Sequence, residues 1–288
     1  MPVLKNTRFL LSVLILVLSS SAMADQQVIR ITGIPDENPT ELQRKYKPLV
    51  AYLEKKLGKK IKYVPVINYN SAVAALAAKK VDFAWLGGFT HVQARIITGA
   101  TPVVMRKIDR QFKSVIIAHH SAGIKTPTDL KGKTFAFGSK SSTSGHLMPR
   151  HFLSTRFNID PDKNFKSKPV FSGAHDATAM IVQSGRVQAG ALNREVWKRL
   201  VKTKKIDTSK VKVIWTTPAY VDYVWTARKG LDPALVTKFR SAFLTLDPLR
   251  PAHKAVLSLQ GAKGFVKGHA KDFNAIEKVG YKTGLLRK

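Results

Sequence analysis

The sequence predicts an α/β fold with largely parallel sheets, arranged in two lobes. Three observations support this prediction: short β-rich runs alternate with helical patterns, the same order recurs in both halves, and the chain is 288 residues long. Strands that alternate with helices are typical of parallel sheets covered by helices. At roughly 100 to 200 residues per domain, this length accommodates two such units.

The first half opens with a strand followed by a helix. Val28 to Gly33 alternates between apolar and polar residues, and Thr40 to Leu57 carries apolar residues at helical spacing before Gly58. Pro48 lies inside that helix and predicts either a bend or a boundary. Later elements are strands at Ile61 to Val66 and Val81 to Leu86, helices at Ser71 to Lys79 and His91 to Ile97, and β-rich runs at Val103 to Arg106 and Ser114 to Ala118.

The second half repeats this order around a polar loop. Thr126 to Leu130 is typical of a helix-initiating turn, and Thr134 to Phe137 of a strand. Gly138 to Gly145 is a polar loop before a helix that begins near His146. Further strands are predicted at Pro169 to Phe171, Val187 to Ala191 and Val211 to Trp215, and helices at Ala174 to Ser184 and Arg194 to Leu200. In such sheets ligands bind beyond the carboxyl ends of strands, at loops that lead into helices.

The N-terminus has the pattern of a signal peptide. Lys5 and Arg8 precede the apolar run from Phe9 to Leu18, and Ala22-Met23-Ala24 then offers a cleavage site before Asp25. The alternative is an uncleaved membrane anchor, but the apolar run is shorter than the roughly 20 residues that span a bilayer. We therefore expect residues 1–24 to be removed and the protein to reside in the periplasm.

The absence of cysteine and of several catalytic motifs excludes some classes of function. The chain forms no disulfide, has no thiol nucleophile and carries no lipid on a cysteine at the cleavage site. It also lacks a complete Gly-x-x-x-x-Gly-Lys-Ser/Thr phosphate loop, a His-Glu-x-x-His metal motif and a Gly-x-Ser-x-Gly elbow. We expect a binding protein rather than an enzyme, with no cofactor and no metal ion.

The chain is strongly basic, with a formal net charge of +31. Removal of the leader takes away two cations and no acid, which leaves +29. Such a charge attracts anions in general. Nucleic acid is one alternative partner, but the basic residues are dispersed over several segments and no nucleic-acid-binding motif accompanies them. A solvated basic surface is the simpler interpretation.

The run Ser139 to Gly145 has the chemistry of an oxyanion site. Its hydroxyls meet unpaired backbone N–H groups where a helix is expected to begin, and such helix starts bind anions. Ordinary N-capping by a serine or threonine is the alternative, worth about 1 kcal/mol.

Other expected loops add polar groups and glycines. Gly87 and Gly88 let a backbone approach a ligand closely, although a tight turn also uses glycines. His175 lies at a strand-to-helix junction, where a polar loop residue is equally expected. Tyr69 and the run Tyr220 to Trp225 add phenols and a carboxylate, or else aromatic residues at the edge of the core.

Four short stretches occur together in one known family, in the same order and with similar separations. They are Val81 to Gly87, Ser142 to Gly145, Gly173 to Asp176, and Val213 to Trp215 with Pro218 following. By these stretches the chain resembles the PhnD-like family, the periplasmic phosphonate and phosphite binding proteins of ABC transporters. The resemblance runs from Ile31 to about Leu257. Ile34 to Asn38 and Ala84 to Arg95 look most like a branch described as selenate binders.

The resemblance implies a two-lobed periplasmic binding protein fold, type II-like, in which the chain crosses twice between the lobes and a hinge closes them. Lobe one would comprise residues 25–114 and 224–288, and lobe two residues 115–223. Hinge strands would lie near residues 115–117 and 224–226, where the sequence is β-rich.

The resemblance also implies which residues face the ligand. Ser142 and Thr143 match the hydroxyls that bind the oxyanion, helped by the helix start at Ser144. Tyr69 and His175 match a ligand-facing tyrosine and histidine. Glu195 matches an acid that faces the amine in aminophosphonate binders.

Two departures argue against an aminoalkyl ligand. Leu86 stands where aminophosphonate binders often have tyrosine, and Asp222 lies one position from the family's aspartate, with Tyr223 in its place. A small oxyanion without a tail is therefore the better candidate.

Acidic residues in an anion site that excludes water discriminate between ligands by their protonation state. A carboxylate facing an oxyanion is tolerable only if the ligand supplies a hydrogen to it. Selenate and sulfate carry none at neutral pH, whereas phosphate, phosphite and phosphonates are partly protonated. A pocket that contains Asp222 or Glu195 would favour the phosphorus compounds, and a pocket with donors alone leaves selenate possible.

These inferences predict a monomeric protein that captures a phosphonate, phosphite, phosphate or selenate ion for the permease of an ABC importer in the inner membrane. A ligand-sensing input protein for a membrane signalling partner is the main alternative, and an enzyme on the same fold is another.

Overall fold

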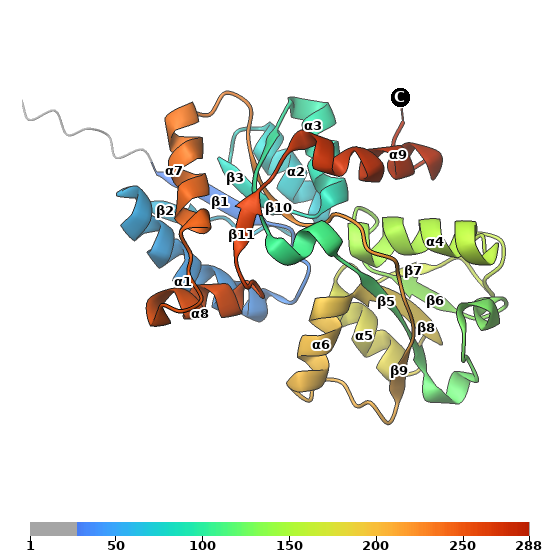
Figure 1. Ribbon diagram of the computed structural model, residues 1–288. Coiled ribbons are helices and arrows are strands. Elements are labelled where there is room, and N and C mark those ends of the chain that lie inside the picture. Colours follow the sequence, from blue (N-terminus) through green and yellow to red (C-terminus); the bar gives the residue numbers. More distant parts are fainter. Residues whose placement is uncertain (1–27, 288) are drawn as a thin grey trace, which may run out of the picture.

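The computed structural model describes residues 28–287, so the predicted signal peptide, residues 1–24, lies outside the described part of the chain. The described strands form two sheets, one of six strands and one of five. Figure 1 shows the sheets in two separate lobes, each with helices packed around it. The predicted two-lobed α/β fold is therefore confirmed.

The six-stranded sheet has the order β11-β4-β10-β3-β1-β2 and combines both ends of the described chain. Its strands are β1 (Ile29–Gly33), β2 (Ile61–Tyr63), β3 (Phe83–Leu86), β4 (Thr101–Arg106), β10 (Val224–Ala227) and β11 (Phe265–Lys267). The helices of this lobe are α1 (Pro39–Leu57), α2 (Tyr69–Ala77), α3 (Gly88–Thr98), α7 (Pro233–Leu244), α8 (Pro251–Leu259) and α9 (Asn274–Lys282), with 3₁₀ turns η1 (Lys107–Gln111) and η5 (Ala270–Phe273).

The five-stranded sheet has the order β7-β6-β8-β5-β9 and is built from the middle of the chain. Its strands are β5 (Ser114–His119), β6 (Phe135–Phe137), β7 (Val170–Phe171), β8 (Ala189–Asn193) and β9 (Val211–Thr216). The helices are α4 (Met148–Phe157), α5 (His175–Gln183) and α6 (Arg194–Lys202). Short turns are η2 (His120–Ala122), η3 (Pro127–Leu130) and the π-helical turn η4 (Thr143–Leu147).

The expectation of largely parallel sheets needs a correction, because both sheets are mixed. β1 pairs in parallel with β2 and β3, but β10 runs antiparallel to β3 and β4. In the other sheet β6 is parallel to β7 and β8, whereas β5 runs antiparallel to β8 and β9. β5 and β10 are the first strands after the chain changes sheets, so each enters its sheet against the prevailing direction.

Two crossing segments connect the sheets, at residues 107–113 and 217–223. They pair with each other through one antiparallel bridge, in which the backbone N–H groups of Phe112 and Tyr220 donate to each other's carbonyl oxygen at 2.8 and 3.0 Å. The β-rich runs near which we expected the hinge belong to β5 and β10, each flanked by strands inside its own sheet. Both strands directly follow a crossing segment, and the position of the hinge stays a prediction.

The lobes also touch each other through contacts outside this bridge. Phe89 N–H donates to Thr143 Oγ1 at 2.9 Å, and Ser141 Oγ donates to Asn70 Oδ1 at 2.7 Å. His175 N–H likewise donates to the carbonyl of Asp36 at 2.9 Å. The structure therefore describes a closed arrangement of the lobes.

The predicted elements differ from the observed ones mainly at their ends. Gly88 begins α3, three residues before the expected start, and Tyr69 begins α2. Pro48 marks no boundary, because α1 continues through it to Leu57. No helix between residues 28 and 287 is both long and apolar enough to cross a bilayer.

Candidate functional site

The polar loop after β6 forms one wall of a buried site between the lobes. Ser142 Oγ accepts a hydrogen bond from Gly145 N–H at 2.9 Å and so caps the turn η4. N-capping and anion binding are compatible here, since the hydroxyl hydrogen of Ser142 remains free to donate. Ser142, Thr143 and Ser144 are all buried.

The start of α3 forms the opposite wall. Gly88 N–H donates to Asp222 Oδ1 at 2.9 Å, and Phe89 N–H donates to Thr143 Oγ1. A Cβ atom on Gly87 would lie 3.0 Å from Thr143 Oγ1 and 3.2 Å from Asp222 Oδ1. The backbone, a hydroxyl and a carboxylate thus approach one point, and a Cβ atom there would press on both side chains.

Asp222 is the most perturbed acid of this group. Burial raises the pKa of its carboxyl to about 7, although the hydrogen bond from Gly88 and the hydroxyl of Thr143 act in the opposite direction. Its Oδ2 atom is buried and has no hydrogen-bond partner among the described residues. A buried acceptor without a partner is costly unless a ligand supplies a hydrogen.

Tyr69 brings a second unpartnered group, because its buried hydroxyl has no hydrogen-bond partner among residues 28–287. Burial first, and the charge of Asp36 next, raise the pKa of this phenol well above its ordinary value. The phenol therefore keeps its proton at neutral pH and is a donor for an anion.

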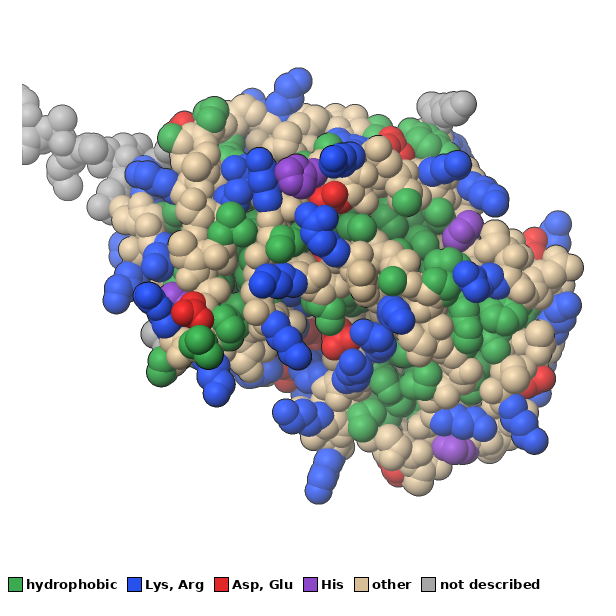
Figure 2. All heavy atoms as spheres, viewed as in Figure 1, with side chains coloured by type: hydrophobic (Ala, Val, Ile, Leu, Met, Phe, Trp, Pro, Cys, Tyr) green, Lys and Arg blue, Asp and Glu red, His purple; other side chains and the backbone are tan. Residues whose placement is uncertain are grey.

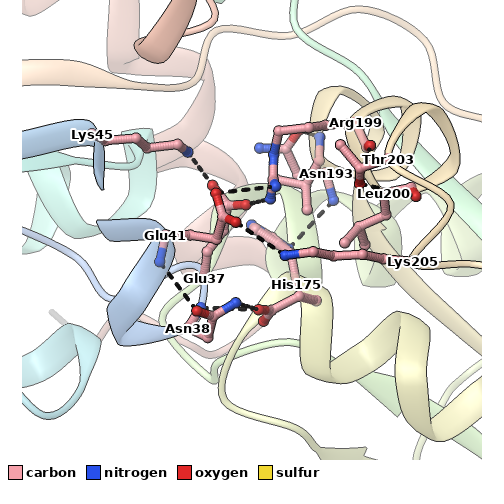
Figure 3. A network of polar contacts seen from close by, with 12 residues as sticks. Glu37, Asn38, Glu41, Lys45, His175, Asn193, Arg199, Leu200, Thr203 and Lys205 are labelled. Atoms are coloured by element: carbon pink, nitrogen blue, oxygen red, sulfur yellow. Dashed lines mark hydrogen bonds and ion pairs between the residues drawn. The ribbon is translucent and has the colours of Figure 1, made fainter. Parts of the chain in front are cut away.

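His175, Asn193 and Tyr223 form a hydrogen-bonded cluster beside the two walls, with the first two visible in Figure 3. Asn193 N–H donates to His175 Nδ1 at 3.3 Å, which leaves the proton of the neutral imidazole on Nε2. Burial lowers the pKa of His175 to about 4, so the ring is neutral at pH 7. His175 Nε2 and Asn193 Nδ2 then both donate to the Tyr223 hydroxyl, at 3.2 and 3.1 Å. The hydroxyl hydrogen of Tyr223 is left to donate elsewhere.

The ring of Tyr223 is held from the other lobe. It stacks on Trp85 with ring centroids 5.6 Å apart, and the Arg106 guanidinium lies 5.0 Å from its centroid. Asp109 binds Arg106 through both carboxylate oxygens, at 2.7 and 2.8 Å. Tyr223 thus connects the lobes at the second crossing.

Glu195 differs from the other predicted site residues. It lies in the first turn of α6, and its carboxylate pairs with Arg194 and Lys198. It borders a separate cavity of about 90 Å³ that Tyr223 and Asn193 also line. The structure therefore gathers nine of the ten predicted residues around the site, and places the Glu195 carboxylate among surface cations.

The chain matches a known family of binding proteins. A family model described as "ABC transporter, phosphonate, periplasmic substrate-binding protein" matches residues 31–273. The chain belongs to this family. A binding protein of this family works with an ABC transporter, so this membership implies a permease partner and a periplasmic location.

Several relatives of this phosphonate-binding family have been described. The chain is 37% identical over 96% of its length to a probable ABC transporter phosphite binding protein, PhnD1, from Prochlorococcus marinus, covering 96% of that protein. It is 27% identical to the phosphonates-binding periplasmic protein of Escherichia coli, over 85% of this chain and 74% of the relative.

Solved structures agree with the fold. The structure of P. marinus PhnD1 in complex with methylphosphonate has a TM-score of 0.87 at 36% identity, covering 91% of this chain and all of that one. A binding protein component of an ABC phosphonate transporter from Pseudomonas aeruginosa has a TM-score of 0.82 at 24% identity, covering 90% of this chain and 87% of that one, and supports the fold alone.

Sequence reasoning missed Asn193 and Arg106, which organise the site. Asn193 caps α6 by accepting from Glu195 N–H and Val196 N–H, while its amide reaches Tyr223. An asparagine directly before a predicted helix was a detectable capping signal. The Arg106–Asp109 pair had a spacing of three residues in the sequence, but nothing there placed it beside Tyr223.

The described residues offer no group of three or more His, Asp or Glu side chains placed to hold a metal ion. The candidate site is instead made of hydroxyls, phenols, backbone N–H groups and one carboxyl. This donor set suits an oxyanion.

The raised pKa of Asp222 predicts a stability effect. In the unfolded chain this carboxyl ionises near its ordinary pKa of 3.8, and in the folded chain it keeps its proton up to about pH 7. The folded state therefore binds more protons between these values, so the free energy of unfolding falls as the pH rises through them. At about 1.4 kcal/mol per pH unit, the loss is on the order of 4 kcal/mol.

Urea unfolding of wild type and Asp222→Asn at pH 5 and pH 8 checks this prediction. All other titrating groups are shared, so the difference between the two proteins reports Asp222. We expect the asparagine variant to gain stability relative to wild type as the pH rises. Equal pH dependence of the two proteins would contradict the raised pKa.

Proposed function

We propose that this protein captures a small tetrahedral phosphorus oxyanion, such as methylphosphonate or phosphite, and presents it to the permease of an ABC importer. The observation that carries the proposal is the buried, unpartnered Oδ2 atom of Asp222 beside the hydroxyls of Thr143 and Tyr69. A monoprotonated phosphonate or phosphite supplies both oxygens for the donors and a hydrogen for the carboxylate. The ligands named for the P. marinus relative are of this kind.

The same observation supports a protonated phosphorus compound over selenate. Sequence reasoning left selenate open if both acids faced solvent, but Asp222 has no exposed surface. A fully ionised tetrahedral anion would meet this carboxylate without a hydrogen between them. The experiment must therefore compare selenate directly with the phosphorus compounds.

Capture requires the lobes to open and close, because the site residues are buried in the closed arrangement. We propose lobe one as residues 25–114 with 224–288 and lobe two as residues 115–223, a division supported by which strands share a sheet. The Phe112–Tyr220 bridge is then the hinge. Both walls of the site come from one chain, which supports capture by a monomer, released into the periplasm after cleavage of residues 1–24.

Thermal shifts of the ligand-free protein test the proposed function. Methylphosphonate, phosphite, phosphate, aminoethylphosphonate, sulfate and selenate are compared at constant ionic strength, so that general screening of the basic surface cancels. A specific ligand stabilises the fold by RT ln(1 + [L]/Kd), about 2.7 kcal/mol at a hundredfold excess over Kd. We expect the large shifts to be confined to small phosphorus compounds. A shift with selenate or sulfate alone would overturn the proposal.

A further inference from the structure

Both lobes carry a large positive charge, and closure brings these charges together. Residues 25–114 and 224–288 contain 29 Lys and Arg against 11 Asp and Glu, a formal charge of +18. Residues 115–223 contain 18 against 7, a formal charge of +11. Figure 2 shows the basic side chains scattered over the visible face of both lobes. Repulsion between the lobes therefore opposes closure.

Acids are scarce in this chain, but several of them lie at the lobe interface. Glu37 lies just before α1 and Glu41 in its first turn, while Asp176 lies in the first turn of α5 on the other lobe. Figure 3 shows Glu37 and Glu41 facing Arg199 and Lys205, which come from α6 and the loop after it. The acids of one lobe thus meet the cations of the other.

Glu37 is the centre of this contact. Its side chain is 0% exposed, and its carboxylate pairs with Lys45 of its own lobe and with Arg199 of the opposite lobe. Glu41 adds ion pairs across the interface to Lys205 at 3.0 Å and to Arg199 at 3.4 Å.

A hydrogen-bonded pair extends the contact. Asn38 caps α1 by accepting from Glu41 N–H at 3.1 Å, and its backbone N–H and side-chain amide both donate to Asp176 Oδ2 at 2.9 Å. The turn before α1 and the first turn of α1 therefore contact both α5 and α6. None of these side chains is among the hydroxyls, phenols and carboxyl that form the oxyanion site.

We propose that Glu37 and Arg199 are the central pair of an electrostatic latch between the lobes. The latch also includes Glu41, Lys205 and the Asn38–Asp176 contact. It slows ligand release because it stabilises the closed form against the repulsion between two basic lobes. Arg199 and Lys205 lose these partners when the lobes separate, so the latch acts only in the closed state. Breaking it accelerates opening and leaves the encounter of ligand with the open form unchanged. The latch rests on the proposed function in one respect, since capture by closure is what it serves.

The test compares Arg199→Met with Arg186→Met by stopped flow, following tryptophan fluorescence on binding and release of methylphosphonate. Arg186 is exposed on the same lobe, so both variants lose one cation and only the first loses the latch. We expect Arg199→Met to raise the dissociation rate constant 10- to 100-fold with an association rate constant within threefold of the control. Glu37 is buried, and without Arg199 its carboxylate keeps only Lys45 as a partner, which is why the effect exceeds that of a surface pair. Equal dissociation rates in the two variants would overturn the latch.

Two further measurements keep the test independent of folding and of the ligand. Glu37→Gln should give a similar effect from the other lobe, and its combination with Arg199→Met should cost less than the two separate losses together, because the residues form one contact. Additive losses would argue against a direct pair. If no oxyanion binds the wild type, the proposed function fails. Small-angle scattering of the ligand-free proteins still tests whether the latch stabilises the closed form. A larger radius of gyration for Arg199→Met than for Arg186→Met supports it, and equal radii contradict it.

Discussion

Replacing Ser142 and Thr143 together by alanine is expected to lower the affinity for methylphosphonate by a factor of about 10² to 10⁴. Each hydroxyl is buried, and a hydrogen bond to a charged group contributes about 1.5 to 3 kcal/mol. Two such bonds correspond to this factor at 1.4 kcal/mol per tenfold change. Thr143 also accepts the hydrogen bond from Phe89 N–H across the lobes, so its loss weakens closure as well. Isothermal titration calorimetry measures the change.

Ser154→Ala/Thr155→Ala is the matched control for this prediction. These residues form an exposed Ser-Thr pair on α4, in the same lobe as the oxyanion loop. The control should bind as the wild type does, and both variants should unfold cooperatively. Retained affinity in Ser142→Ala/Thr143→Ala would remove the loop from the site.

Asp222→Asn is expected to convert a site that selects protonated anions into one that accepts sulfate and selenate. Above pH 7 the ionised carboxylate of the wild type faces a fully ionised anion without a hydrogen between them, whereas the amide of the variant donates one. Mismatched polar groups in a buried site cost about four to five orders of magnitude in selectivity. We expect the affinity ratio of methylphosphonate to sulfate to fall about tenfold in the variant at pH 8, where the wild-type carboxyl is mostly ionised.

The wild type should also accept sulfate better in acid. Because the pKa of Asp222 is about 7, its carboxyl gains a proton below that pH and then donates to the anion. Sulfate affinity in the wild type should therefore fall by up to tenfold per pH unit above pH 7 and level off below it, whereas it should stay flat in Asp222→Asn. Calorimetric titrations from pH 5 to 8 measure this, with the exposed Asp162→Asn as the control for charge. An unchanged ligand preference in Asp222→Asn would show that the carboxyl does not face the ligand.

The sequence by itself determined the alternation of strands and helices and the nature of the main oxyanion loop. Local patterns carry this information: Ile29–Gly33 alternates because one strand face is buried, and the helix at Pro39–Leu57 ends at Gly58, whose φ of 64° suits glycine. The serine-rich loop after β6 was recognisable because hydroxyl capping and anion binding depend on residues close together in the chain.

Only the tertiary structure decided which residues meet across the lobes. Asp222 lies 134 positions from Gly88, and Asn38 lies 138 from Asp176, so no local pattern connects them. The antiparallel entry of β5 and β10 also follows from the chain crossing between sheets rather than from the strands' own sequences. Burial then gave these groups their properties, because the pKa of an aspartate depends on how far the folded chain removes it from water.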